Sequence, residues 1–263
     1  MDDPYAAPRT VTDLANCYFY HTMDVPGHGL VSGEWDLRAG VDAYLGGVDL
    51  HGRRVLEIGT ASGFLCFAME RRGADVVAFD LAPEQTPDLV PSPGVDPEQR
   101  GRDHRQHLHK LTNAFWLCHR AFASRARVVH SNVYAVPESI GPVDVTTFGC
   151  VLLHLRDPFL ALSSALRLTR QTAIVTEPVV IRSRLKRWLR RLLGPAMLFF
   201  PRGRPGEPET TWWILEPELI ATFLRLLGFT ETSVTYHRQG YRGRPVELFT
   251  VVGRRPPGAA WPH

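Results

Sequence analysis

A glycine-rich turn follows a short apolar run and is the first place in the chain where residue type and spacing suggest chemistry. Residues 57–63 read EIGTASG. Gly59 lets the chain turn sharply and approach a ligand closely, and Gly63 can open a helix. The lysine of a phosphate-binding P-loop is absent, which disfavours ATP or GTP hydrolysis. The spacing G-x-x-x-G also departs from the pyrophosphate fingerprint G-x-G-x-x-G, which disfavours NAD and FAD.

Polar residues stand at the ends of the next two predicted strands. Asp80 can accept hydrogen bonds from both hydroxyls of a ribose, or it can cap a helix before Pro83. Asn132 can pair with an adenine edge, with Leu81 and Val133 on either side of the base, or it can be an ordinary turn residue. These residues and the glycine turn all follow the ends of successive strands of one sheet. Taken together, they predict a binding site for adenosine.

The elements that position these residues alternate between strand and helix. Residues 53–58, 62–72 and 75–80 predict a right-handed βαβ unit. The pattern predicts an α/β fold with a Rossmann-like, seven-stranded, mostly parallel sheet and helices on both faces. Ligands of such folds bind outside the carboxyl ends of the strands. The later elements are a Pro-rich loop at 82–102, helices at 103–123, 158–168 and 217–228, and strands at 126–131, 143–149, 171–177, 230–237 and 246–252.

Segments outside this alternation predict additions to the core. An N-terminal helical cap is expected at 1–51, with helices at 10–22 and 35–45, and an inserted helical lid is expected at 181–213. The core then comprises a cofactor-binding part at 52–180 and a C-terminal part of the sheet at 214–253, before a flexible tail at 254–263. The arginine-rich stretch 182–191 could be a lid face, an oligomer contact, a clamp for an anionic substrate or a solvated helix face.

Four runs in this order resemble the class I S-adenosylmethionine-dependent methyltransferases: VLEIGTASGF at 55–64, Asp80, SNVYAVP at 131–137 and DVTTFGCVLLH at 144–154. The resemblance covers about residues 50–180. The flanking runs YHTMDVPG at 20–27, GEWDLR at 33–38 and TWW at 211–213, with Gly228 and Phe229, resemble one branch of that family. This branch is related to tRNA wobble-uridine carboxymethyl transferases and to actinobacterial small-molecule methyltransferases.

Two departures refine what the resemblance implies. Ala61 stands where the family has the central glycine of its motif, and we expect the turn to accommodate its methyl group. Thr210 stands where the tRNA enzymes have an arginine for a carboxylated cofactor. The resemblance therefore implies plain S-adenosylmethionine, with S-adenosylhomocysteine as product, and a small-molecule acceptor in specialised (natural-product) metabolism.

The resemblance also implies individual roles for residues at the strand ends and in the cap. Arg38 would pair with the cofactor carboxylate, or be a surface arginine. The residues implied in cofactor binding are Trp35, Arg38, Glu57, Gly59, Ala61, Gly63, Asp80, Leu81, Asn132, Val133, Gly149 and Cys150.

Candidates for proton transfer and for acceptor contacts come from the crevice side of the strands. His154 could act as general base, because its ordinary pKa lies near neutrality, or it could cap the helix at Pro158. His21 and His28 are further candidates for the base. Trp212 and Trp213 could form a wall for an apolar substrate and close over the crevice, or they could be packing residues.

Composition limits the remaining functions. The 263 residues are 44% hydrophobic and carry a net charge of +3, as expected of a globular chain. The balance of 30 basic to 27 acidic residues disfavours a nucleic-acid partner. An enzyme that methylates or carboxymethylates a tRNA or RNA base is kept as the second hypothesis, and a non-catalytic cofactor-binding protein as the third. Four separated cysteines predict reduced, buried thiols and no metal site. No signal peptide or membrane span is found, so we expect a cytoplasmic protein, and a homo-oligomer is left open.

Overall fold

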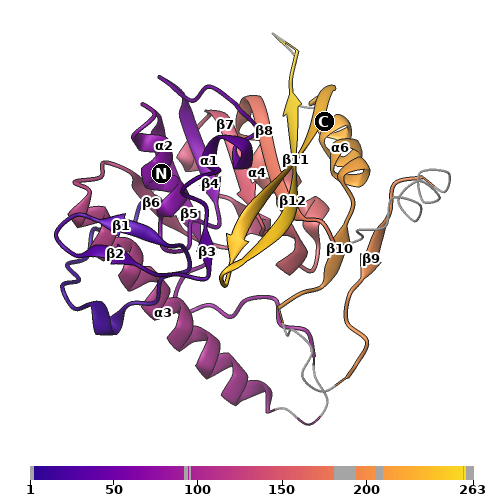
Figure 1. Cartoon of the computed structure of the whole chain (residues 1–263). Coiled ribbons are helices and arrows are strands. Elements are labelled where there is room, and N and C mark those ends of the chain that lie inside the picture. Colours follow the sequence, from indigo (N-terminus) through magenta and orange to yellow (C-terminus); the bar gives the residue numbers. More distant parts are fainter. Residues whose placement is uncertain are drawn as a thin grey trace.

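A mixed sheet forms the centre of the molecule (Figure 1). The computed structural model describes residues 3–91, 94, 96–180, 194–204, 210–256 and 258. The sheet has eight strands in the order β3-β11-β12-β8-β7-β4-β5-β6. The bounds are β3 (Trp35–Asp36), β4 (Arg54–Ile58), β5 (Asp75–Asp80), β6 (Arg127–His130), β7 (Val143–Gly149), β8 (Thr169–Pro178), β11 (Glu231–Tyr241) and β12 (Arg244–Arg254).

Strand directions confirm the predicted Rossmann-like architecture. The five strands β4 to β8 run parallel to one another, whereas β12 pairs antiparallel with β8 and β11 pairs antiparallel with β12. The predicted count of seven strands was one too low. The eighth strand is β3, whose two residues pair with Gly240 and Tyr241 at the edge of the sheet. A strand this short carries no apolar alternation that a sequence pattern could reveal.

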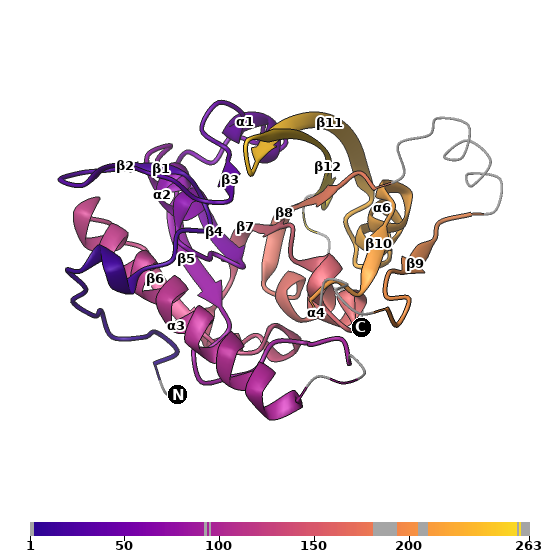
Figure 2. The ribbon, with the colours of Figure 1, turned by 60° about the horizontal axis from the view of Figure 1, so that its bottom comes forward.

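Helices cover both faces of the sheet (Figure 2). One core contains residues of α1 (Val41–Tyr44), α2 (Phe64–Glu70) and α3 (Pro97–Ala121), and the other contains residues of α4 (Pro158–Leu166) and α6 (Pro217–Leu226). Helix α3 begins six residues earlier than predicted. The Asp96 side chain accepts a hydrogen bond from the Glu98 amide (2.9 Å) and Pro97 opens the first turn. The described residues also contain four 3-10 turns: η1 (Leu14–Asn16), η2 (Val133–Ala135), η3 (Glu138–Ile140) and η4 (Leu152–His154).

The predicted helical cap was wrong for the described residues 3–51. Residues 10–22 contain only the short turn η1, and a hairpin of β1 (Met23–Val25) and β2 (Gly29–Val31) follows. The Trp35 amide donates to the Tyr20 carbonyl (3.0 Å) and the Thr22 amide donates to the Trp35 carbonyl (2.7 Å). These strand-type pairs use the backbone groups that a helix would need for itself. Only Val41–Tyr44 of the second predicted helix is helical.

The predicted lid is described only in part. Residues 181–193 and 205–209, including the arginine-rich stretch, lie outside the described residues. The described part contributes β9 (Met197–Phe199), which pairs antiparallel with β10 (Trp213–Leu215). Across the described part of the chain, no helix has both the length and the apolar character needed to cross a membrane.

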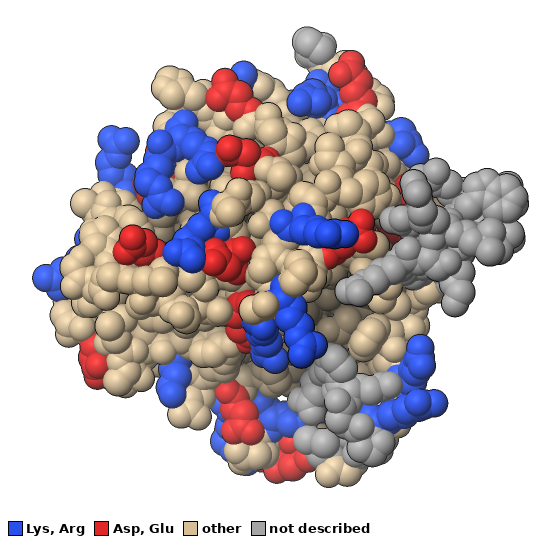
Figure 3. Space-filling model, viewed as in Figure 1, with Lys and Arg blue, Asp and Glu red and all other residues tan. Residues whose placement is uncertain are grey.

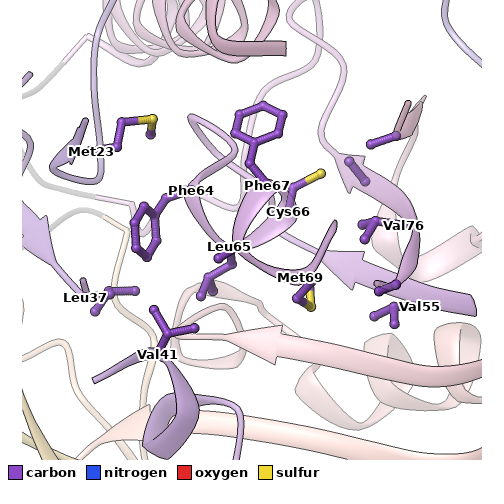
Figure 4. Packing of buried hydrophobic residues seen from close by; sticks show 14 of the residues in the cluster. Met23, Leu37, Val41, Val55, Phe64, Leu65, Cys66, Phe67, Met69 and Val76 are labelled. Atoms are coloured by element: carbon purple, nitrogen blue, oxygen red, sulfur yellow. The ribbon is translucent and has the colours of Figure 1, made fainter. Parts of the chain in front are cut away.

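Helix α2 is packed between the sheet and the N-terminal segment (Figure 4). Its side chains lie between Val55 and Val76 of the sheet and Met23, Leu37 and Val41 of the segment that precedes it. The Phe67 ring is 2% exposed, and its centroid lies 5.4 Å from that of Phe115 and 5.2 Å from that of Phe122. The helix that follows the glycine turn is thus held by the cap, the sheet and α3 together.

We therefore expect Phe67→Ala to lower the free energy of unfolding by about 3–5 kcal/mol, because the buried ring leaves a cavity among its aromatic neighbours. Urea unfolding followed by circular dichroism measures this change. The matched control is Phe199→Ala, whose ring is 58% exposed and whose loss should change stability by less than about 0.5 kcal/mol. Equal effects of the two substitutions would contradict this description of the core.

Candidate functional site

The turn between β4 and α2 is sharp, as the sequence predicts from its glycines. Gly59, Ala61 and Gly63 all adopt positive φ, at 81°, 50° and 87°. A Cβ atom at Gly59 would collide with the Val151 side chain, and one at Gly63 would lie 2.5 Å from the Phe67 ring. Glycine is therefore required at both ends of the turn, whereas Ala61 tolerates the left-handed conformation at its centre.

Glu57 lies beneath this turn. Its side chain is 2% exposed and accepts a hydrogen bond from the Thr60 hydroxyl (2.7 Å). Burial raises the pKa of the Glu57 carboxyl to about 8, although the Thr60 hydroxyl and the Cys66 amide favour its charged form. The contacts that Glu57 makes in this structure are with the turn and with the first turn of α2.

Asp80 joins the end of β5 to the glycine turn. One carboxylate oxygen accepts from the Ala61 amide (2.7 Å) and the other accepts from the Leu81 amide (2.8 Å). Burial raises the pKa of the Asp80 carboxyl. Asp80 caps no helix, because the next α-helix begins at Pro97. Each oxygen keeps acceptor capacity beyond its amide partner, which suits a pair of ligand hydroxyls.

The end of β6 carries Asn132 and Val133. Asn132 is exposed, and its side-chain oxygen accepts from the Tyr134 amide (2.9 Å), as expected of a turn residue. Its amide nitrogen is a donor that this contact does not use. Val133 is buried and Leu81 is half-buried. The residues predicted to contact adenine thus lie just after the carboxyl ends of β5 and β6.

Gly149 is the last residue of β7, and Cys150 follows it. A Cβ at Gly149 would lie 2.8 Å from the Tyr44 hydroxyl, and Cys150 has a positive φ of 53°. The Tyr44 hydroxyl lies 3.6 Å from the Cys150 sulfur. Burial raises the pKa of the Cys150 thiol, so that the thiol stays protonated. Of the four cysteines, all free, Cys66 and Cys118 are buried as predicted, whereas Cys17 and Cys150 are half-buried.

The two predicted cap residues differ in their surroundings. Trp35 is buried, and its indole nitrogen donates to the Tyr20 hydroxyl (3.2 Å). Arg38 is exposed and forms a bidentate ion pair with Asp36, in which Nε donates to Oδ1 (2.8 Å) and Nη2 donates to Oδ2 (2.7 Å). The guanidinium of Arg38 is therefore already paired, and a ligand carboxylate would have to compete with Asp36.

The three candidate histidines occupy very different places. The Nδ1 atom of His154 lies 2.6 Å from the Thr210 carbonyl, which places the proton on Nδ1 and a lone pair on Nε2. Burial lowers the pKa of His154. It does not cap α4, because the Asp157 side chain accepts from the Leu160 amide (2.9 Å).

His21 and His28 belong to the cap. His21 is 6% exposed, burial lowers its pKa to about 3, and its amide donates to the Ser62 hydroxyl of the glycine turn (3.2 Å). Its Nδ1 atom has no partner among the described residues. His28 is exposed in the turn between β1 and β2, and no contact links it to the strand ends within the described part of the chain.

Trp212 and Trp213 lie against the loop that follows β7. Trp212 is 9% exposed; its amide donates to the Leu153 carbonyl and its indole to the Asp88 carbonyl, both at 2.8 Å. Trp213 is half-buried, and its indole donates to the Arg156 carbonyl (3.3 Å). These contacts agree with a packing role for Trp212.

Two carboxylates of this edge were missed by sequence reasoning. Asp88 accepts from the Arg156 amide (2.8 Å) and from the Tyr134 hydroxyl, and so ties three loops together. Glu177, near the end of β8, is buried and accepts from the Leu152 amide (2.8 Å). Asp88 lies in a Pro-rich loop whose sequence shows no motif. Glu177 ends a buried apolar run just before Pro178, and an acidic residue in that place could have been noticed.

Several solved structures share this architecture. No family model and no curated protein matches the chain. A protein of Bacillus halodurans C-125 assigned as a methyltransferase is 12% identical, with a TM-score of 0.53 over 83% of this chain and 99% of its own. The N-terminal domain of EvdMO1, solved in the presence of S-adenosylhomocysteine and D-fucose, is 16% identical, with a TM-score of 0.51 over 92% and 93%.

Magnesium protoporphyrin IX methyltransferase of Synechocystis PCC 6803, solved with bound S-adenosylhomocysteine, is 14% identical, with a TM-score of 0.50 over 84% of this chain and 82% of its own. The chain has the class I methyltransferase fold. In this fold the ends of β4, β5, β6 and β7 are neighbours, so the glycine turn, Asp80, Asn132 and Gly149 meet at one edge. The hydrogen bond between Asp80 and the Ala61 amide shows that two of the predicted groups are in contact.

The raised pKa of Glu57 leads to a prediction about stability. Between the ordinary pKa of 4.5 and the folded value of about 8, folded Glu57 keeps a proton that the unfolded chain has lost. This contribution to stability therefore falls by about 1.4 kcal/mol per pH unit across that window, and Glu57→Gln removes the dependence. Urea unfolding between pH 5.5 and 8 should show the variant gaining stability relative to the wild type as pH rises. Parallel curves would contradict a raised pKa.

Proposed function

We propose that the chain is an S-adenosylmethionine-dependent methyltransferase acting on a small molecule. The observation that carries this proposal is the Asp80 carboxylate bound to the glycine turn, at adjacent strand ends of a class I methyltransferase fold. An acid in this place can accept the hydroxyls of a ribose while the turn brings backbone groups close to the rest of the ligand.

The residues at this edge fit the cofactor. The strands are buried up to their ends, whereas Gly59, Ala61, Asp80, Leu81 and Cys150 are partly exposed, so a ligand can reach them. Gly59 to Gly63 would hold the methionine portion, Asp80 the ribose and Asn132 the adenine, with Gly149 and Cys150 below the sulfonium. When bound, the cofactor supplies an electrophilic methyl group.

The chain's own residues then orient the acceptor and receive its proton. His154 is the best placed of the three candidate histidines, because the Thr210 carbonyl fixes its ring and leaves the Nε2 lone pair available. Its lowered pKa keeps the ring neutral at pH 7, as a proton acceptor must be. Trp213, half-buried beside the same loop, supplies an aromatic wall for the acceptor.

The distribution of charge favours a small molecule over RNA. Arg53, Arg167, Arg170 and Arg254 line a wide hollow at the edge where the parallel strands begin, opposite the candidate site. On the face shown in Figure 3, basic and acidic side chains are interspersed. An RNA enzyme would instead need a basic groove that continues into the site.

We expect the purified chain to bind S-adenosylmethionine or S-adenosylhomocysteine at micromolar concentration or tighter, and not NAD. Calorimetry measures all three. Asp80→Ala should weaken cofactor binding by about 1.5–3 kcal/mol, because it removes hydrogen bonds to a charged acceptor. The control is Asp75→Ala at the exposed start of the same strand, which should leave affinity unchanged. If calorimetry shows no heat of binding with S-adenosylmethionine or with S-adenosylhomocysteine, the proposal is wrong. An unchanged dissociation constant in Asp80→Ala would show that Asp80 does not bind the cofactor.

A further inference from the structure

Glu177 is a buried acid for which the proposed chemistry has no use. It lies next to the last residue of β8, and its side chain is 1% exposed. One oxygen, Oε1, accepts from the Leu152 amide (2.8 Å), and the amides of Val151 and Leu153 also favour its charged form. The other oxygen, Oε2, has no partner among the described residues. Burial of a carboxyl group costs free energy unless the group is hydrogen-bonded, so the bonds from the turn offset the cost of burying Glu177.

The segment that Glu177 holds is the turn Cys150–His154. The turn starts in the left-handed conformation of Cys150, whose amide donates to the Thr176 carbonyl (2.8 Å). It ends at His154, whose amide donates to the Val151 carbonyl (2.9 Å). The Leu153 carbonyl within it accepts the Trp212 amide (2.8 Å). One buried acid therefore supports a turn that carries both the candidate base and an attachment point of the segment at 210–213.

The groups around the Glu177 carboxyl show that backbone amides, and not a cationic side chain, are its main partners. Tyr44 of α1 and Cys150 of the loop after β7 are the titratable groups that it influences, and burial raises the pKa of both, so both stay protonated and neutral. On the neighbouring strand β12, Phe249 is the residue opposite Glu177. With no basic partner facing it among these described residues, the carboxyl is matched mainly by the amides of the turn.

We propose that Glu177 is a positioning residue: it fixes the turn Cys150–His154 and thereby the ring of His154 on the acceptor side of the site. This inference rests on the proposed function for its catalytic meaning. Glu177 acts through the backbone of the turn and not by contact with the cofactor. Its loss should therefore loosen residues 151–153, from whose amides it accepts, and with them His154, while Cys150 stays held by the bond from its own amide to the Thr176 carbonyl. Cofactor affinity should then stay nearly intact.

The test compares Glu177→Met, which removes the oxygens at similar length, with Glu177→Gln, which keeps an acceptor oxygen. The control is Thr176→Val on the opposite face of the same strand, where the hydroxyl is bonded to the Tyr44 carbonyl and the Thr250 hydroxyl, each at 2.8 Å. Three quantities are measured in the full chain: amide exchange at 151–154, the pKa of His154 by NMR titration, and S-adenosylmethionine affinity by calorimetry.

In Glu177→Met we expect amide exchange at Leu152 and Leu153 to become about tenfold faster or more, and the pKa of His154 to rise toward its ordinary value as the ring becomes solvated. Glu177→Gln should stay close to the wild type in both, and Thr176→Val should change neither. Cofactor affinity should stay within about twofold in all variants.

Unchanged exchange and an unchanged pKa of His154 in Glu177→Met would overturn the proposal, as would equal changes in Thr176→Val. A parallel loss of cofactor affinity would also overturn it, because Glu177 would then support the whole edge. If Glu177→Met does not fold, amide exchange in the wild type tests the proposal. We expect the Leu152 and Leu153 amides to be as protected as those of β7. Exchange as fast as that of exposed loops would refute the proposal. Failure of the wild type to bind S-adenosylmethionine would instead refute the proposed function.

Discussion

Backbone amides and the Thr60 hydroxyl, at the ends of the parallel strands, donate to carboxyl groups that the fold buries, and the site depends on these bonds. Glu57 and Asp80 hold the two sides of the glycine turn, and Glu177 holds the turn after β7. Burial of a carboxyl group costs free energy unless the group is hydrogen-bonded, and burial of an amide without an acceptor also costs free energy. Each acid and its turn therefore stabilise one another, and the edge of the sheet has a defined shape before any ligand arrives.

The N-terminal segment completes this edge by strand-type pairing. The His21 amide donates to the Ser62 hydroxyl within the glycine turn, and Trp35 joins the segment to the sheet through β3. The Trp35 ring also packs against that of Tyr241, with centroids 4.6 Å apart. Residues that precede the core in the chain thus lie beside the strand ends, which explains how a cap built from loops and short strands can contribute to the site.

The core and much of the site could be predicted from the sequence because their signals are local. Apolar runs ended by Gly59 and Asp80 define β4, α2 and β5, and the positions of these residues at the strand ends follow from the pattern. The cap could not be predicted, because its form depends on pairing between residues 20–22 and Trp35. Asp88 was missed because its partners, the Arg156 amide and the Tyr134 hydroxyl, belong to distant loops and leave no mark in the spacing around it. Glu177 ends a buried run and could have been noticed, but its bond to the Leu152 amide could not be predicted from that position.

A crystal structure of the chain with S-adenosylhomocysteine is the most direct test of a cofactor site formed by the carboxylate-supported turns. We predict the ribose hydroxyls within hydrogen-bond distance of Asp80, the homocysteine part over Gly59 to Gly63, and the hydrogen bonds of Glu57 and Glu177 to their turns unchanged. Density for the ligand at another place, or turns that rebuild and release these acids on binding, would contradict the account.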